Sequence, residues 1–302
     1  MDRIDKGILS DLAANCRTTF GVLSKRYGIS SSAIKKRVKK LEESGVIFGY
    51  TLLFSRAMIG ANPLFGLLET DGSQDEEEFV LQLGQNDKII AAASYSGAHY
   101  ALVAEYRNSQ ELWDIGAYLR SFNCVERVEM HQLLDQPGDT MNLSRLHLRL
   151  INYLIDDPRM SIASLAEKAG FTAKRARKLV NELVESNAIY FRALLELDAA
   201  GSIPFLARIT WNEKAVDHNV IVKWLKETFP LTLWETYISV GTPIIICLIT
   251  GNNLREVDLT TRSIRRHEHI QTVRVLINKH HKYFTSNRHK AIRELLEREG
   301  IC

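Results

Sequence analysis

The chain has 302 residues, of which 45% are hydrophobic and 25% charged, an ordinary globular composition that is long enough for two to four domains. Asp2, Arg3, Asp5 and Lys6 interrupt any apolar N-terminal run, so no signal peptide is expected, and the longest apolar stretch, residues 244–249, is too short to span a bilayer. The four cysteines are scattered without a CxxC pair, which favours a reduced cytoplasmic compartment. Because no apolar run is long enough to span a bilayer, no membrane partner is expected.

Positive and negative charges are segregated along the chain, although the formal net charge is only +3. Residues 24–40 carry seven Lys or Arg and no acid, whereas residues 69–87 carry seven Asp or Glu and no base. Like charges four residues apart repel each other on a helix. A solvated surface helix is the ordinary interpretation of such a run, but a run of one sign favours a surface that binds a polyanion.

The first fifty residues predict three helices. Two apolar stripes at helical spacing mark the first two, one made of Ile4, Ile8, Leu9 and Leu12 and the other of Val22, Leu23 and Tyr27. Gly28 closes the second helix, and Ser30 is the expected N-cap of a third helix that ends near Gly45. The third helix has a buried stripe of Ile34, Val38 and Leu41.

Residues 46–54 are β-branched and aromatic and predict a strand or hairpin wing after the third helix. Two helices, a glycine turn, a basic helix and a wing are typical of the winged helix-turn-helix, whose last helix enters the major groove of double-stranded DNA. The predicted DNA contacts on that helix are Ser31, Ser32, Lys35, Lys36, Arg37, Lys39 and Lys40.

The same pattern recurs 142 residues later, without a gap, which indicates an internal duplication. Gly28 corresponds to Gly170 and Leu41 to Leu183. The second basic helix has Asn181 and Glu182 in place of Lys39 and Lys40, but gains cations near its start. The predicted DNA contacts of the second copy are Lys174, Arg175, Arg177 and Lys178. The alternative is that the second basic helix has lost its function and no longer binds DNA.

Each basic helix is followed by the order strand, helix, strand, strand, helix, strand, which is the ferredoxin-like pattern. The fold class is therefore α+β, with two winged helix-turn-helix domains that alternate with two βαββαβ domains. The expected boundaries are residues 1–50, 51–134, a linker at 135–142, 143–192, 193–284 and a C-terminal amphipathic helix at 285–302. This last helix is expected to dock on the second ferredoxin-like domain or on a partner chain.

The chain resembles the Lrp/AsnC, or feast/famine, family of transcription regulators. The residues that carry the resemblance are Ile4-Asp5, Ile8-Leu9, Asn15-Cys16-Arg17, Gly28-Ile29-Ser30, Arg37, Leu41-Glu42, Gly45-Val46-Ile47 and Gly49-Tyr50. The resemblance implies a nucleoid-associated regulator built as two fused family units, a covalent pseudo-dimer. It also implies homo-oligomerisation through the ferredoxin-like domains.

No cofactor is expected, but the resemblance implies a small-molecule effector near the turn between the central strands, where family members have a glycine followed three residues later by aspartate. The corresponding residues are Gly97, His99 and Tyr100 in the first copy and Gly241 and Thr242 in the second. Neither copy has the aspartate, so no carboxylate pairs with the ammonium group of an amino acid at this position.

The sequence also allows two other interpretations, an enzyme and a metal site. Siroheme decarboxylases resemble this family in fold and also come as paired units, and His99 and His131 are available to such chemistry, but a decarboxylase has no need of a basic recognition helix. The histidines at 267–269 and 280–281 lack a second cluster at metal-ligand spacing, so no metal site is expected. No catalytic residues are predicted.

Overall fold

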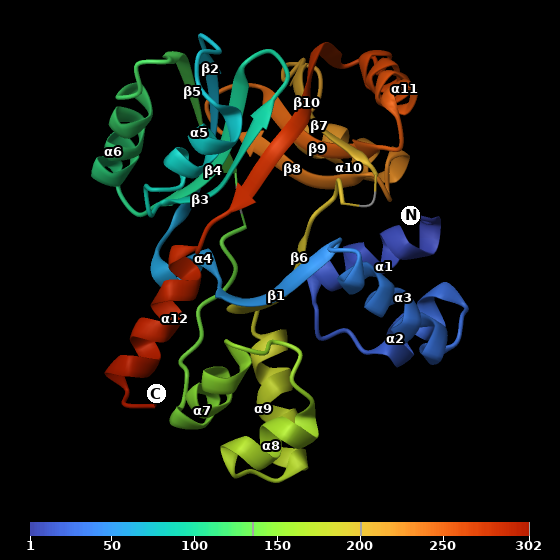
Figure 1. Cartoon of the computed structure of the whole chain (residues 1–302), viewed down its shortest axis with the longest axis vertical. Helices are drawn as coiled ribbons and strands as arrows, with labels where there is room; N and C mark the ends of the chain where they lie inside the picture. Colours follow the sequence, from blue (N-terminus) through green and yellow to red (C-terminus); the bar gives the residue numbers. More distant parts are fainter. Residues whose placement is uncertain (135, 200, 302) are drawn as a thin grey trace. The chain divides into compact units, whose positions relative to one another are not determined.

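The computed structural model describes residues 1–134, 136–199 and 201–301 and divides the chain into two compact units (Figure 1). Unit 1 contains Met1–Gly60, Pro137–Ala200 and Arg288–Cys302. Unit 2 contains Ala61–Gln136 and Gly201–Asn287. The helical heads of both repeats thus belong to unit 1, and both ferredoxin-like modules belong to unit 2.

The first head has the predicted helices α1 (Arg3–Ala14), α2 (Phe20–Tyr27) and α3 (Ser31–Glu43). Its core includes Ile8, Leu9, Leu12, Leu23, Ile34, Val38 and Leu41. Val22, which the pattern placed in the apolar stripe of α2, is 47% exposed instead. Gly28 ends α2 with φ +67°, a left-handed conformation that glycine adopts without strain.

The second head repeats this arrangement with α7 (Arg145–Leu154), α8 (Ile162–Ala169) and α9 (Ala173–Glu185). Gly170 ends α8 with φ +66°, as Gly28 ends α2. Leu150, Ile151, Leu154, Leu165 and Leu183 are fully buried. The two heads therefore share both the glycine that ends the second helix and the buried apolar positions, as the duplication in the sequence predicts.

The wing of each head is completed by the other head, which corrects the expectation of a local hairpin. Strand β1 (Ile47–Phe54) pairs antiparallel with β6 (Ile189–Leu195), from Ile47 opposite Leu195 to Phe54 opposite Ile189. A short helix, α4 (Arg56–Ile59), follows β1 before the chain enters unit 2. Among the described residues of unit 1, no second strand follows β1 locally. The equivalent strand of the other repeat, β6, therefore pairs with the backbone hydrogen-bonding groups at the edge of β1.

The C-terminal helix α12 (Asn287–Arg298) lies in unit 1 (Figure 1). His289 Nδ1 lies 3.2 Å from the carbonyl oxygen of Leu52 on β1, and Arg293 pairs with Asp156 of the second head at 2.7 Å. Ile292 and Leu296 are buried. The expectation that this helix docks on the second ferredoxin-like domain is therefore wrong, because its apolar face is used within the helical unit.

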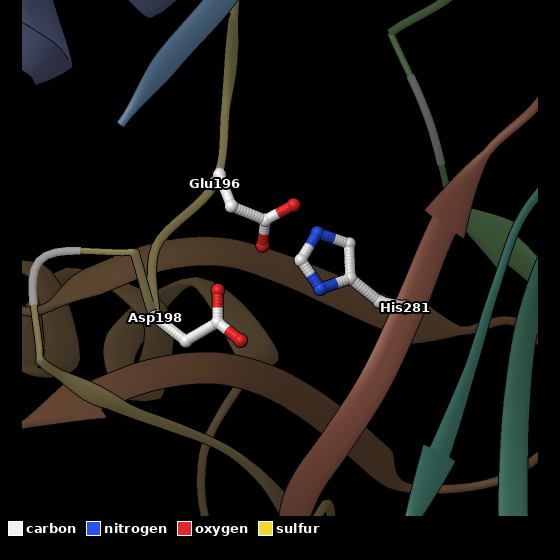
Figure 2. Close-up of side chains that lie close together, drawn as sticks. All are labelled: Glu196, Asp198 and His281. Carbon is white, nitrogen blue, oxygen red and sulfur yellow. The ribbon is translucent and has the colours of Figure 1, made fainter. Parts of the chain in front are cut away.

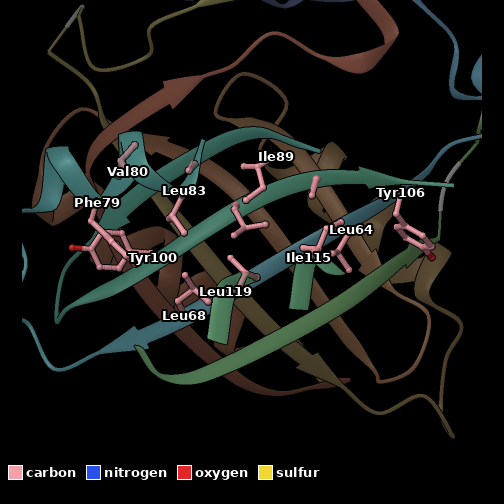
Figure 3. Packing of buried hydrophobic residues seen from close by; sticks show 13 residues of the cluster. Leu64, Leu68, Phe79, Val80, Leu83, Ile89, Tyr100, Tyr106, Ile115 and Leu119 are labelled. Carbon is pink, nitrogen blue, oxygen red and sulfur yellow. The ribbon is translucent and has the colours of Figure 1, made fainter. Parts of the chain in front are cut away.

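Unit 2 begins with the first βαββαβ module. Its elements are β2 (Asn62–Thr70), α5 (Glu76–Leu83), β3 (Ile89–Tyr95), β4 (His99–Tyr106), α6 (Ser109–Arg120) and β5 (Val125–Leu134). Figure 3 shows its core, in which Phe79 and Leu83 of α5 and Ile115 and Leu119 of α6 lie with the apolar side chains of the sheet.

The second module follows the same order. Its elements are β7 (Ile203–Trp211), α10 (His218–Thr228), β8 (Leu233–Ser239), β9 (Ile244–Gly251), α11 (Leu254–Arg265) and β10 (Ile270–Tyr283). Its helix-side core contains Phe205, Ile221, Leu225, Ile245, Cys247 and Ile249.

The two modules close into one sheet of eight strands, in the order β10-β3-β4-β2-β5-β8-β9-β7. Strand β10 pairs with β3 of the first module, and β5 pairs with β8 through Leu133 opposite Ser239 and Leu134 opposite Ile238. The inner face has its own core, which contains Phe65, Leu67, Ala93, Tyr95, Ala101, Leu206, Ile244 and Ile246. The run at residues 244–249 is apolar throughout because β9 packs against helices on one side and this inner core on the other.

Two of the expected domain boundaries need correction. The boundary after residue 50 falls inside β1, and the boundary after residue 192 falls inside β6, because these strands pair with each other and remain whole in unit 1. The expected linker at 135–142 has no helix or strand at 136–142, and residue 135 lies outside the described residues. Asp139 in this segment bonds to the backbone of Asn187 and to Ser55, so the segment contacts both heads. None of the helices in the described residues has the length and apolarity needed to cross a membrane.

Candidate DNA-binding surface

The first recognition helix, α3, presents most of its predicted contacts to solvent. The Ser30 side chain accepts from the N–H of Ala33 at 3.2 Å and caps the helix, as predicted. Burial of Ile34, Val38 and Leu41 fixes the rotation of the helix, so the opposite face is outward. The exposed residues on that face are Ser31, Ser32, Lys35, Lys36, Lys39 and Lys40.

Arg37 differs from the other cations of α3 because its guanidinium is held within the head. Its Nη1 lies 2.7 Å from a carboxylate oxygen of Asp2 and 2.7 Å from one of Asp5. The pKa of Asp2 lies below its ordinary value, because its carboxylate accepts from the N–H of Asp5 and from Arg37. Arg37 therefore braces α3 against α1, a role that the charge pattern alone did not reveal.

The second recognition helix, α9, is also capped and outward-facing. Thr172 accepts from the N–H of Arg175 at 3.3 Å, and Ala176, Leu179, Val180 and Leu183 are buried. The predicted contacts Lys174, Arg175, Arg177 and Lys178 are all exposed. The guanidinium carbon of Arg175 lies 5.5 Å from the ring centroid of Phe171, which orients this side chain at the start of the helix. Both heads thus expose a basic recognition helix.

The turn predicted to bind an effector in the first module lies between β3 and β4. Gly97 has φ +75° and Ala98 φ +57°, so this tight turn requires glycine at 97. His99 is half-buried, with Nδ1 3.3 Å from the Ser96 carbonyl oxygen and Nε2 3.6 Å from a carboxylate oxygen of Glu69.

Tyr100 is fully buried, which corrects its assignment to an effector site. Its ring packs edge-on against Phe79 at 4.8 Å, and its hydroxyl accepts from Gln74 at 2.8 Å. Successive strand residues face opposite sides of the sheet, so Tyr100 belongs to the helix-side core whereas His99 does not.

The corresponding turn of the second module, between β8 and β9, has a different conformation. Gly241 does not have a positive φ. The Thr242 hydroxyl lies 3.0 Å from the Ser239 hydroxyl, which in turn lies 3.1 Å from Nδ1 of His131 on β5. His131 is buried, and burial lowers its pKa, although Glu129, 3.5 Å from Nε2, opposes the shift. Thr242 is therefore part of a hydrogen-bonded chain that joins the two modules.

We assign no metal site to the acidic and histidine side chains drawn in Figure 2. Glu196 and Asp198 follow β6 in unit 1, whereas His281 lies on β10 in unit 2. The histidines at 267 and 269 have ring centroids 5.6 Å apart, and His267 packs on Trp224 with centroids 4.4 Å apart. These ring contacts give His267 and His269 a packing role.

Both heads match a family of known proteins. A family model described as winged helix-turn-helix DNA-binding matches residues 1–47 and again residues 143–190. Each match contains a whole recognition helix, α3 in the first and α9 in the second. The comparison therefore confirms two winged helix-turn-helix regions in one chain.

Several curated relatives are transcription regulators. The HTH-type transcriptional regulator LrpA of Pyrococcus horikoshii is 32% identical over 120 residues, which are 38% of this chain and 82% of that protein. LrpA of Pyrococcus abyssi is 36% identical over 107 residues, 32% of this chain and 76% of that protein. The regulatory protein AsnC of Escherichia coli is 29% identical over 104 residues, 34% of this chain and 67% of that protein.

Solved structures of a siroheme decarboxylase resemble the whole chain in fold. The crystal structure of the siroheme decarboxylase NirDL has a TM-score of 0.55 and covers 99% of this chain and 100% of that chain, at 15% sequence identity. At this identity the likeness shows a shared fold, and nothing about chemistry.

Proposed function

Because the chain belongs to the Lrp/AsnC family of transcription regulators, we propose that it is a sequence-specific DNA-binding regulator in which one chain carries both heads of a pseudo-dimer. The observation that carries the proposal is the exposure of a capped basic helix in each head. The side chains proposed to contact DNA are Ser31, Ser32, Lys35, Lys36, Lys39 and Lys40 on α3, and Lys174, Arg175, Arg177 and Lys178 on α9. The site of action is then chromosomal DNA in the cytoplasm.

The two helices differ in the kind of contact that they offer. Helix α3 has serines at its start and lysines along its length, which suits phosphate contacts. Helix α9 has Arg175 near its start, the end that reaches base edges, and arginine there pairs with guanine through two hydrogen bonds. The proposal therefore includes two different half-sites within one operator.

A selection experiment tests this proposal. The full-length protein selects duplexes from a random DNA library, and the recovered sequences are footprinted and titrated. Enrichment of a motif with two unlike halves, and affinity that falls steeply with salt, is the expected result. Recovery of random sequence with affinity no better than for bulk DNA would contradict it.

The proposal also includes control by a small metabolite and assembly of chains through unit 2. The first module keeps the glycine turn at Gly97 with His99 beside it, but the Tyr100 side chain is buried in the core. The sheet edges of the two modules are paired with each other within one chain, β10 with β3 and β5 with β8. Light scattering with and without amino acids tests both points.

The alternative is a tetrapyrrole enzyme of the siroheme-decarboxylase type, suggested by the shared fold. Two exposed basic helices speak against it, because such chemistry does not require them. An absorbance spectrum after addition of an iron porphyrin separates the two functions. A stoichiometric Soret shift, together with no selected DNA motif, would favour the enzyme.

A further inference from the structure

The two heads of unit 1 meet through the same loop of each repeat. The loop between α1 and α2 carries Cys16 and Arg17, and the loop between α7 and α8 carries Pro158 and Arg159, which lie 142 positions later in the sequence. Both loops lie beside the paired strands β1 and β6: Cys16 donates its N–H to the carbonyl of Phe191 on β6 at 2.8 Å.

Arg17 reaches from the first head into the second. Its Nη1 donates to the carbonyl oxygen of Pro158 at 2.7 Å, and its Nη2 donates to that of Met160 at 3.1 Å. Its guanidinium carbon lies 5.7 Å from the ring centroid of Phe191. A single guanidinium therefore holds two backbone positions and one strand of the second head.

Arg159 makes the reciprocal reach from the second head into the first. Its Nη1 donates to the hydroxyl oxygen of Tyr50 on β1 at 2.8 Å. Its guanidinium carbon lies 4.9 Å from the centroid of the Tyr50 ring and 5.2 Å from that of Phe20, the first residue of α2. The Arg159 side chain is only 21% exposed, so these contacts are shielded from bulk water.

The geometry requires arginine on both sides. A planar guanidinium donates in two directions at once while it stacks on an aromatic ring, and an ammonium does neither as well. Because the contacts of each arginine lie on the opposite head, rotation of one head against the other would break both sets, and the β1–β6 pairing resists the same rotation.

We infer that Arg17 and Arg159 lock the two heads into one rigid body, so that the protein recognises two half-sites of duplex DNA only at one helical phase. Both arginines are positioning residues, since their contacts are to protein and not to DNA. This inference rests on the proposed function: it adds that the spacing of the half-sites, and not only their sequence, determines which DNA is bound.

Phased insertions test the inference with the full-length protein and the duplex that it selects. Insertion of about half a helical turn between the protected half-sites removes one head from its groove, and a rigid protein should then lose roughly a hundredfold in affinity. In the Arg17→Lys/Arg159→Lys variant, the insertion should cost roughly tenfold, clearly less than in wild type, because the β1–β6 pairing resists rotation of the heads less well without the two guanidinium contacts. Arg255→Ala, an exposed arginine on α11 of unit 2, is the control and should keep the wild-type penalty.

Several outcomes would overturn the inference. Tolerance of the insertion by the wild-type protein would do so while leaving DNA binding intact, whereas failure to select any duplex would contradict the proposed function itself. An equal penalty in wild type and variant would show that the arginines do not set the phase. If the double variant does not fold, Arg17→Lys alone serves. Hydrogen exchange adds a readout without DNA: unchanged exchange at the β1 and β6 amides of the variant would count against the lock.

Discussion

His147 of α7 and Glu182 of α9 lie with Nε2 and Oε2 3.0 Å apart, and this pair places its acid on the recognition helix, unlike the brace in the first head. There the acid, Asp5, is on the first helix and the cation, Arg37, is on the recognition helix. Asp5 is the counterpart of His147, and Lys40 is the counterpart of Glu182. The acid that replaces a lysine on α9 therefore has a structural role, and its presence is not a sign that the second recognition helix has decayed.

Reversing charge on the first recognition helix should abolish DNA binding without unfolding the protein. Lys36 and Lys39 are exposed, so Lys36→Glu/Lys39→Glu removes phosphate contacts and introduces repulsion. If the two heads neutralise about six phosphates, the logarithm of the wild-type binding constant should fall with the logarithm of salt concentration at a slope of roughly −5. Titration by electrophoretic mobility shift measures both effects.

The matched control for that variant is Lys214→Glu/Lys223→Glu, which makes the same change in net charge at exposed positions of unit 2. It should bind nearly as well as wild type. Full binding by a folded Lys36→Glu/Lys39→Glu protein would refute the assignment of α3.

The heads could be predicted from sequence because their determinants are local. Helical spacing of Ile34, Val38 and Leu41 fixed the buried face of α3, and Ser30 and Gly28 marked helix ends. The ferredoxin-like order followed from apolar strands that alternate with helices. In both cases the pattern that predicts the structure spans only neighbouring turns of one helix or neighbouring strands of the chain.

The pairings between repeats could not be predicted in this way. The partner of β1 is β6, and Arg17 bonds to backbone 141 and 143 residues away. No periodicity encodes such contacts. The partner of Arg37 was missed for a related reason: Asp2 and Asp5 lie on another helix, and a count of charges does not reveal which cation an acid neutralises.

Truncating Ile245 should destabilise unit 2 strongly. This side chain is fully buried between β9 and the helices of the second module, so Ile245→Ala leaves a cavity and should cost about 2–5 kcal/mol of unfolding free energy. Val240→Ala, at a side chain that is 61% exposed, should cost far less. Denaturant titration compares the two, and equal midpoints would contradict the placement of Ile245 in the core.

The stability of unit 2 should depend on pH through His131. Burial lowers the pKa of His131 in the folded protein below its ordinary value of 6.5, so the unfolded chain binds the proton more tightly. The free energy of unfolding is therefore highest above about pH 6.5, where His131 is neutral in both states. It decreases as the pH falls towards the lower pKa of the folded protein, because the unfolded chain then binds the proton first. Glu129 and Arg208 face this ring, the first favouring and the second opposing its protonation.

The variant His131→Gln removes that titration. Denaturation midpoints at about pH 7.5 and about pH 5.5 should differ less in His131→Gln than in wild type. His280→Gln changes an exposed histidine and should keep the wild-type difference. The same pH dependence in all three proteins would mean that other groups account for it.

The two heads should protect separable halves of the operator. Arg175 and Arg177 are exposed on α9, whereas their counterparts in the first head are Ala33 and Lys35, so the base contacts of the two helices differ. Arg175→Ala/Arg177→Ala should therefore erase nuclease protection at one half-site and leave the other, at protein concentrations raised to offset the lost affinity. Arg255→Ala/Arg266→Ala on the exposed surface of unit 2 should leave both halves protected. A footprint that is unchanged by the α9 substitutions would make the second head structural, and loss of both halves together would mean that neither head holds DNA without the other.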